Sequence, residues 1–217
     1  MFKQLTCEIP NTCVVACSGG ADSLAALIFA HNHGKRDVTA LHVKHGDSRF
    51  ANNSVLFVNT VCEGLNIPID VVEIPMSTGS RNISQEAQWS VARAEVYSRY
   101  NAPVTVAHTL DDAVEWWLMR AIRGKQPTLI KTENRNVIRP FLLWSKDDMK
   151  EYLTYRRRVW MEDPTNHDGT SNMRSVIRAK LSPVVNEISD LKPAIYRMYL
   201  KQVTERRQLS YKGSHSK

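Results

Sequence analysis

The stretch Val14–Ser23 reads V-V-A-C-S-G-G-A-D-S, and it decides the fold of this chain. A short β-branched run leads into the pair Gly19-Gly20, and an apolar run follows directly. This order predicts a strand, a glycine turn and the start of a helix. Two glycines let the backbone approach a ligand closely, and a helix N-terminus presents unpaired N–H groups. The stretch therefore favours the binding of a polyphosphate.

Polar side chains flank the two glycines. Ser18 and Ser23 offer hydroxyl donors, and the Asp22 carboxylate can hold Mg²⁺ or cap the helix. The alternative is an ordinary strand-to-helix turn in which Asp22 is only the N-cap, because G-G-x-D-S is a short string. The stretch matches neither the Walker A pattern nor the dinucleotide-binding G-x-G-x-x-G.

The composition is that of a soluble globular protein, with 217 residues, 42% of them hydrophobic and 24% charged. This length fits one α/β domain and a small C-terminal addition. The chain has no apolar run long enough to span a bilayer, and residues 1–10 lack the apolar core of a signal peptide. We therefore expect a cytoplasmic protein that does not bind membranes.

The four cysteines contain no C-x-x-C pair. In a cytosolic chain they are expected to be packed free thiols, with a metal or iron–sulfur role as the alternative. They are Cys7, Cys13, Cys17 and Cys62.

Positive charge is concentrated in two places. The net charge is +7, residues 192–217 hold seven Lys/Arg against one acid, and Arg156-Arg157-Arg158 forms a second cluster. A basic tail can serve solubility alone, but the internal cluster favours a nucleic-acid partner. We expect a catalytic domain over 1–188 and a basic helical extension over 189–217.

Apolar runs and turn signals alternate along the chain and predict a doubly wound parallel sheet, the α/β class. Strands are expected at 14–16, 38–43, 69–74 and 103–107, and helices at 22–33, 53–65, 84–100, 111–123, 145–157, 172–188 and 193–208. The polar segment 125–136 is expected to form a loop or a hairpin lid, and an apolar segment follows at 138–143.

The fourth strand leads into a second polar motif, A-H-T-L-D-D-A-V-E at 107–115. Asp111 and Asp112 come at a helix N-terminus, which favours carboxylates. Asp112 and Glu115 are three residues apart and share one helical face. Together they can hold a cation, either Mg²⁺ or the ammonium group of a substrate amine. The alternative is a well-capped helix whose acids face water.

Residues 18–23 resemble the S-G-G-x-D-S motif of the N-type ATP pyrophosphatases, which cleave ATP between the α and β phosphates. The other motifs resemble, in their order, those of the tRNA(Ile)-lysidine synthetase family over residues 13–188. They are L-H-V-K-H-G, A-R with a following tyrosine, A-H-T-L-D-D-A-V-E, R-G, R-P-F-L, E-D-P-T-N and R-S-V-I-R.

This resemblance implies a reaction and a set of site residues. The family adenylates the C2 oxygen of the wobble cytidine in tRNA(Ile); lysine then attacks C2, and AMP leaves. ATP phosphates and Mg²⁺ would be held by Ser18, Gly19, Gly20, Ala21, Asp22 and Ser23. Asp112 and Glu115 would bind the lysine ammonium, and Asp111, His42 and His108 would lie near the metal or the nucleotide. Phosphate or the adenylated intermediate would be stabilised by Arg93, Arg174 and Arg178.

Several positions depart from the family pattern, among them Lys44, Val96, Thr109 and Ser175. Two other functions therefore stay open beside the lysidine reaction. One is a different adenylating enzyme, such as a tRNA thiolase. The other is a non-catalytic module that binds a nucleotide or RNA.

Overall fold

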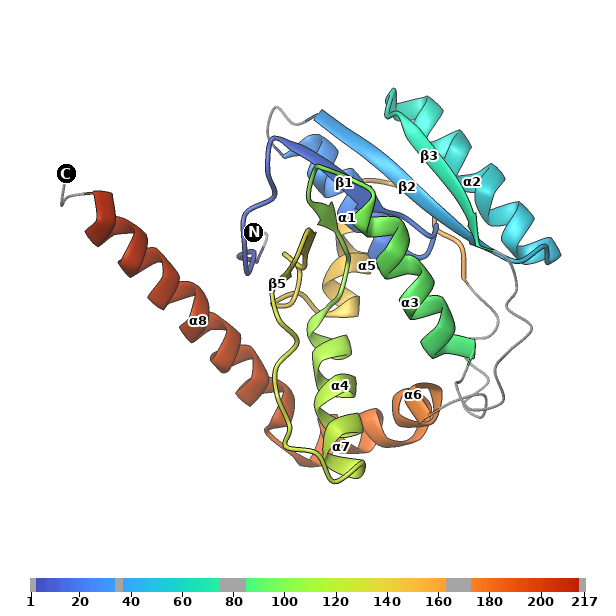
Figure 1. The fold of residues 1–217 in the computed structure, drawn as a ribbon. Coiled ribbons are helices and arrows are strands. Elements are labelled where there is room, and N and C mark those ends of the chain that lie inside the picture. Colours follow the sequence, from blue (N-terminus) through green and yellow to red (C-terminus); the bar gives the residue numbers. More distant parts are fainter. Residues whose placement is uncertain (1–2, 34–36, 75–84, 163–172, 215–217) are drawn as a thin grey trace.

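A six-stranded sheet forms the centre of the protein in the computed structural model, which describes residues 3–33, 37–74, 85–162 and 173–214. The strand order is β3-β2-β1-β4-β6-β5, and only the edge strand β5 runs antiparallel to its neighbour (Figure 1). The strands are β1 Thr12–Ala16, β2 Asp37–His45, β3 Ile69–Ile74, β4 Val104–Thr105, β5 Glu133–Asn134 and β6 Val137–Ile138.

Helices follow most of the strands and continue to the C-terminal end. They are α1 Ala21–Asn32, α2 Arg49–Leu65, α3 Gln85–Ser98, α4 Leu110–Ile122, α5 Lys146–Tyr155, α6 Met173–Val176, α7 Ser182–Ile188 and α8 Leu191–Ser214, with a π-helical turn at Ile177–Leu181. The predicted α/β class with a parallel sheet and a helical C-terminal part is confirmed.

Neighbouring residues of β1 belong to two separate cores. Val15 joins the larger core, with side chains of α1, α2 and α5, whereas Val14 joins a smaller one with Leu41 of β2 and Val96 of α3. Successive strand side chains point to opposite faces of a sheet. Helices therefore cover both faces, and Figure 1 shows α3 in front of the sheet with α1 and α5 behind it.

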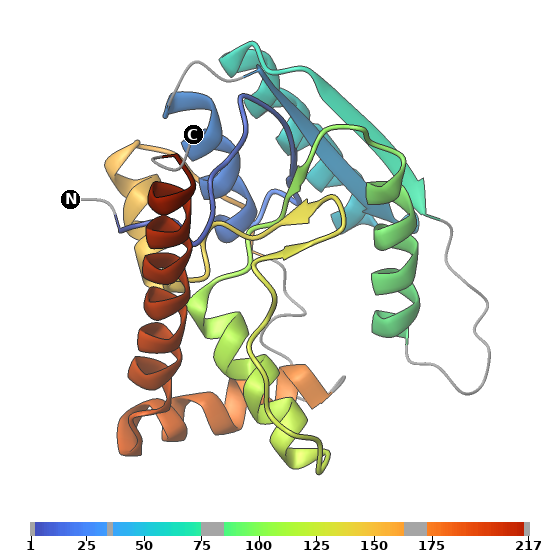
Figure 2. The same ribbon diagram turned by 60° about the vertical axis from the view of Figure 1, so that its left-hand side comes forward.

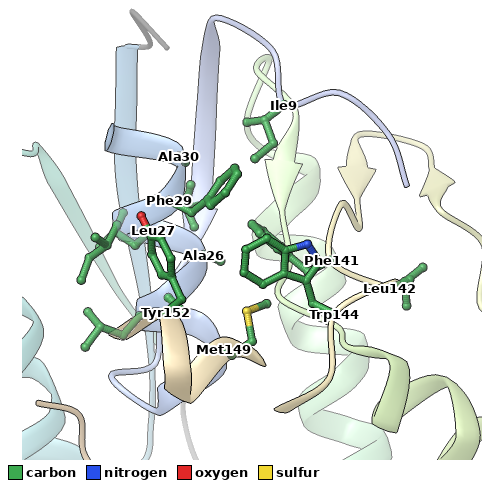
Figure 3. Close-up of a cluster of buried hydrophobic side chains, with 14 of the residues drawn as sticks. Ile9, Ala26, Leu27, Phe29, Ala30, Phe141, Leu142, Trp144, Met149 and Tyr152 are labelled. Atoms are coloured by element: carbon green, nitrogen blue, oxygen red, sulfur yellow. The ribbon is translucent and has the colours of Figure 1, made fainter. Parts of the chain in front are cut away.

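Aromatic rings join α1 to α5 and to the segment that precedes it. The Phe29 ring meets those of Phe141 and Trp144 nearly edge-on, at centroid distances of 5.5 and 5.4 Å (Figure 3). Trp144 and Tyr152 are almost completely buried in the same cluster. Edge-to-face pairs add to the stabilisation from burial. This packing fixes the N-terminus of α5, which carries part of the site described below.

The order in which successive strands of the chain join the sheet changes direction at β1. β2 and β3 lie on one side of it, while β4 and β6 lie on the other. In open α/β sheets, ligands bind outside the carboxyl ends of the strands at such a reversal. β1 ends at Ala16, just before the two glycines, and β4 ends shortly before the N-terminus of α4. The topology thus brings the two predicted polar motifs to one edge.

Several predicted elements differ from the structure in extent. α2 begins at Arg49 rather than at residue 53, because the Ser48 side chain caps it by accepting from the amide of Ala51 at 3.1 Å. β4 is restricted to Val104–Thr105 rather than 103–107. The last helix runs over Leu191–Ser214, longer at both ends than the predicted 193–208.

The segment around 125–138 also differs from the prediction. It ends in a hairpin, but β6 of this hairpin joins the sheet beside β4, with Ile138 opposite Thr105. Arg135 in the connecting turn has a φ of 54°, in the left-handed region. The β-branched pair at 137–138 suits a strand, and it places the hairpin within the sheet rather than above the site.

The region predicted as one helix at 172–188 consists of α6, the π-helical turn and α7. Several other predictions lie outside the described residues. They are the first residues of the helices predicted at 84–100 and 172–188 and most of the E-D-P-T-N motif.

The first half of the helix α8 packs into the main domain, and Arg206 in its second half pairs with Glu133 of β5 at 2.8 Å. Ile195 and Tyr199 are fully buried, and the Tyr199 hydroxyl donates to the carbonyl of Ile130 at 3.0 Å. Figure 2 shows α8 as one long helix that rises from α7, with α4 beside its first turns. The division into 1–188 and 189–217 stays a prediction. None of the described helices is long and apolar enough to cross a membrane.

Candidate functional site

A cleft of about 810 Å³ opens at the carboxyl edge of the sheet, where β1 and β4 end. Its size is in the range of ligand sites in proteins. The sequence-predicted residues that line it are Ser18, Gly20, Ala21, Asp22, Ser23, Arg93, His108, Asp112, Arg174 and Arg178.

Gly19 gives the glycine loop its shape. Its φ is +89°, and an added Cβ would lie 3.2 Å from Cδ1 of Phe57 and 3.3 Å from Cγ2 of Val58. Its carbonyl accepts a hydrogen bond from the amide of Met161 at 3.0 Å. Side chains are disfavoured at this φ, and α2 leaves no room for one. The loop therefore depends on glycine here.

The two serines of the loop hold each other in position. The Ser18 amide donates to Oγ of Ser23 at 3.0 Å, the two hydroxyls lie 3.0 Å apart, and Ser23 donates to the Gly20 carbonyl at 3.0 Å. Gly20 is the N-cap of α1 and offers no side chain for capping. Asp22 lies in the first turn, so the alternative in which Asp22 caps the helix is wrong.

The carboxylate of Asp22 has no positively charged side chain in contact with it among the described residues. It forms no ion pair with any residue that the structure describes. Burial and the nearby charges of Asp112 and Asp111 raise the pKa of Asp22 to about 7, although Lys146 and Arg178 lower it in part. A divalent cation would neutralise this carboxylate. The site therefore fits the Mg²⁺ that the sequence predicted.

The second motif forms a buried network of ions around α4. Asp112 and Glu115 are only 6% and 2% exposed, so the alternative in which these acids face water is wrong. Arg174 donates from Nη2 to Oδ1 of Asp112 and from Nε to Oε2 of Glu115, both at 2.8 Å. Arg178 makes a two-pronged contact with Glu115, at 2.8 and 3.1 Å. Nζ of Lys146 lies 3.2 Å from Oε1 of Glu115 and 3.9 Å from Oδ1 of Asp112.

These contacts set the charge state of both acids. Burial alone would raise the pKa of Asp112, but the charges of Arg174 and Lys146 outweigh it and hold that pKa well below its usual range. Burial also acts against ionisation of Glu115, yet the hydrogen bond from Arg178 and the charge of Lys146 lower its pKa. Both carboxylates are therefore ionised at neutral pH.

Asp111, predicted near the metal, connects three helices. Its Oδ2 accepts from the amide of Lys146 at the start of α5, at 2.8 Å, and its Oδ1 pairs with Nζ of Lys192 of α8 at 2.6 Å. Asp111 does not line the cleft. Its role as a metal ligand stays a prediction, and both of its oxygens already have partners.

The two predicted histidines differ in position. His42 is 2% exposed and lies beneath the loop, where its Nδ1 donates to the carbonyl of Cys17 at 2.8 Å. Burial lowers its pKa. His108 lines the cleft and accepts at Nδ1 from Nε of Arg139, at 2.9 Å. His42 thus supports the loop from below, whereas His108 faces the ligand space.

Sequence reasoning missed several residues of the cleft. Lys146 had a detectable signal, because the capping box of Ser145 and Asp148 places it at the first position of a helix beside this edge. His45, whose Nε2 lies 3.4 Å from Nη1 of Arg93, ends the strand β2 at the same edge. Tyr97, the tyrosine of the A-R motif, also lines the cleft, whereas Lys150, Trp160 and Met161 had no local signal.

Three departures from the family pattern have local structural roles. Thr109 is the N-cap of α4, and both its amide and its hydroxyl donate to Oδ2 of Asp112, at 2.8 and 3.0 Å. Val96 is buried in the smaller core. Lys44 is paired with Asp47 and Glu73 on the surface. At 109 the replacing threonine thus contacts a site carboxylate.

The cysteines are packed as free thiols. Burial raises the pKa of Cys17 to about 12 and that of Cys62 to about 11, so both thiols are protonated at neutral pH. Among the described residues, His, Cys, Asp and Glu side chains form no group of three suited to a metal.

Comparison with known proteins places this site in a family. A model described as a PP-loop domain matches residues 2–185. The chain belongs to the PP-loop family. The resemblance predicted from residues 18–23 is thereby confirmed at the level of the family.

Named relatives of this PP-loop chain include three tRNA(Ile)-lysidine synthases. It is 31% identical to those of Thermus thermophilus, Actinobacillus succinogenes and Nitratidesulfovibrio vulgaris, over 79% to 80% of its own length. The matched region covers 36%, 43% and 54% of those proteins, respectively. The chain thus spans at most about half of their length.

Solved structures share the fold of this PP-loop chain. A U34-tRNA thiolase of Methanococcus maripaludis, which holds a [4Fe-4S] cluster, matches with a TM-score of 0.68 at 16% identity, over 91% of this chain and 74% of its own. An NH3-dependent NAD synthetase of Campylobacter jejuni matches with a TM-score of 0.50 at 14% identity. The match covers 90% of this chain and 85% of the synthetase chain. At such identities the likeness concerns the fold alone.

Proposed function

We propose that this chain is an ATP-dependent tRNA-modifying enzyme that makes lysidine. It adenylates the C2 oxygen of the wobble cytidine of tRNA(Ile) and joins L-lysine to C2, with release of pyrophosphate and AMP. One observation carries the proposal. The glycine loop and Asp112 of α4 line a single cleft. Relatives that are 31% identical to the chain over about 80% of its length are named for this reaction.

The glycine loop supports the ATP half of the reaction. Gly20 caps α1, so the free amides at the start of this helix face the cleft where a polyphosphate would lie. Asp22 offers a carboxylate for Mg²⁺, and the bound ion would neutralise phosphate charge. Ser18, Ala21 and Ser23 line the same wall.

The acids of α4 support the amine half. Nζ of Lys146 already lies against Asp112 and Glu115, so this place accommodates a primary ammonium group. A substrate lysine would take a similar position with its own ammonium. Both oxygens of Glu115 already accept hydrogen bonds from cations of the chain. The binding of the substrate ammonium would therefore depend more on Asp112 than on Glu115.

Positioning and charge explain the catalysis. Arg93, Arg174 and Arg178 line the cleft and would stabilise charge on the transferred phosphate and on the adenylated base. The lysine amine attacks C2, and the C2–oxygen bond breaks as AMP leaves. No protein nucleophile is needed, since the substrates are held in the attacking geometry.

The RNA would be held partly by the basic extension 189–217. Lys201 and Arg206 of α8 have side chains that are 78% and 50% exposed. Such cations bind the phosphate backbone in a salt-dependent way.

The test measures AMP and pyrophosphate released from Mg-ATP, with and without L-lysine and tRNA(Ile), and the mass of the nucleosides after RNA digestion. We expect AMP and a lysine-bearing cytidine only when all three substrates are present. Asp112→Asn should raise the KM for lysine and leave Mg-ATP binding intact, whereas Asp22→Asn should weaken Mg-ATP binding. Asp147→Asn, on the exposed first turn of α5, is the matched control.

Other results would point elsewhere. AMP formed with a different amine would retain the mechanism and change the substrate. A bound iron–sulfur cluster with sulfur transfer would indicate a thiolase. RNA binding without any AMP would indicate a non-catalytic module.

A further inference from the structure

His108 and Arg139 follow two neighbouring strands. His108 comes three residues after the end of β4, and Arg139 comes directly after β6, which pairs with β4 in parallel. Nε of Arg139 donates to Nδ1 of His108 at 2.9 Å. The sheet thus holds the two side chains together, and His108 lines the cleft.

Arg139 is itself held in place. Its Nη1 donates to the carbonyl of Lys131 at 3.1 Å, and its amide donates to the carbonyl of Thr132 at 2.8 Å. The carbonyl of Arg139 accepts from the hydroxyl of Thr6 at 2.6 Å. The guanidinium is therefore directed at the histidine by contacts on both its backbone and its side chain.

The chemistry of this contact determines where the histidine proton lies. A guanidinium can only donate hydrogen bonds, so Nδ1 of His108 must be the acceptor and carries no proton. A neutral imidazole with an unprotonated Nδ1 bears its proton on Nε2. The described residues provide no hydrogen-bond partner for Nε2, and the ring lines the cleft.

We propose that Arg139 is a positioning residue that holds His108 as the neutral imidazole with its proton on Nε2, where it donates to an oxygen of the bound nucleotide. This role rests on the proposed function only for the identity of the ligand. His108 then acts as a fixed N–H donor toward charge that develops on an oxygen. It does not shuttle a proton through Nδ1.

The surroundings of His108 favour the neutral ring. Burial lowers its pKa to about 4; the charge of Asp112 raises it, and the charges of Arg139, Arg174 and Arg93 lower it. These are the charged groups that act on the imidazole from α4, α6 and α3 and from the segment after β6. The neutral ring therefore predominates from pH 5 to pH 9.

Nitrogen-15 NMR of histidine-labelled, ligand-free protein tests the tautomer directly. His108→Gln identifies the His108 signals by their loss. We expect an unprotonated Nδ1 and a protonated Nε2 to predominate throughout the range from pH 5 to pH 9. A protonated Nδ1, or a ring that titrates near pH 6.5, would overturn the proposal, whatever the enzyme proves to catalyse.

Variants of Arg139 test whether this residue determines the tautomer of His108. Arg139→Met removes the donor and should give a mixture of tautomers, whereas Arg139→Lys should restore the single tautomer. Arg135→Gln, on the exposed turn of the same hairpin, is the control. If folded Arg139→Met retains the wild-type tautomer, Arg139 is not the positioning residue. If Arg139→Met does not fold, the tautomer of His108 in the wild type and in Arg139→Lys still tests the proposal. A protonated Nδ1 in the wild type would contradict it.

The donor atom is tested by two amide replacements. Gln places an amide N–H near the position of Nε2, and Asn places one near Nδ1. We expect His108→Gln to bind Mg-ATP about tenfold more tightly than His108→Asn, the value of one hydrogen bond. Equal affinities, or tighter binding by Asn, would contradict donation from Nε2. Loss of AMP formation with the tautomer intact would instead refute the proposed function.

Discussion

The two ends of the cleft differ in how their charges are balanced. At the glycine loop, Asp22 has no ion-pair partner among the described residues, and its pKa rises to about 7. At the acids of α4, Arg174, Arg178 and Lys146 surround Asp112 and Glu115, whose pKa values fall. At one end the carboxylate has no cation in contact among the described residues, and at the other end cations of the chain pair with the acids.

This difference indicates two different relations to ligands. A partly buried carboxylate without a contacting cation destabilises the ligand-free fold, and this supports the proposal that a metal ion binds at the loop end. The acids of α4 are already paired without any ligand, so the proposed substrate amine would compete with cations of the chain. Its binding would exchange one ion pair for another.

The largest expected effect comes from breaking the ion network. Glu115→Gln leaves Arg174, Arg178 and Lys146 without their shared partner in a buried place. We expect a loss of about 3–5 kcal/mol in the free energy of unfolding, measured in urea. Glu151→Gln, at an exposed position of α5, should change it by less than about 0.5 kcal/mol. A loss no larger than that of the control would show that the network contributes little.

The next effect concerns the shape of the loop. Gly19→Ala places a side chain at a φ of +89° and within 3.3 Å of Phe57 and Val58. Backbone strain and overpacking together should cost about 2–3 kcal/mol and weaken Mg-ATP binding. Gly64→Ala, in α2 with open space around it, should instead stabilise the protein slightly. Equal unfolding midpoints for the two variants would refute this account of the loop.

The smallest effect has the opposite sign. Asp22→Asn should stabilise the ligand-free protein by on the order of 2 kcal/mol at pH 8, after allowance for solvent screening. The folded-state pKa of Asp22 is raised, so the folded protein loses stability as pH rises from about 4 through about 7. The gain from Asn should therefore be complete above pH 7 and vanish below pH 4.

Unfolding of both proteins across this pH range, without metal, measures that gain. A difference that does not depend on pH would show that Asp22 is not the titrating group. Addition of Mg-ATP should reverse the order, because only the carboxylate holds the ion.

Much of the fold could be predicted because its signals are local. The glycine turn, the capping box at Ser145 and the i, i+3 spacing of Asp112 and Glu115 each depend on residues close in sequence. The joining of β6 to β4 and the division of 172–188 by a π-helical turn were missed. Each depends on contacts with distant elements, so no short window of sequence contains it.

The sequence by itself determined the α/β class, the glycine loop and the acids at the start of α4, since backbone conformation and helical spacing follow from neighbouring residues. Only the tertiary structure decided which cations pair with those acids. Arg174, Arg178 and Lys146 lie 31 to 66 residues from Glu115 or Asp112 and meet them through strand order and helix packing. The charge balance at a buried site depends on every charged group that the fold brings near it. A single sequence motif contains only some of these groups, so it does not determine the balance.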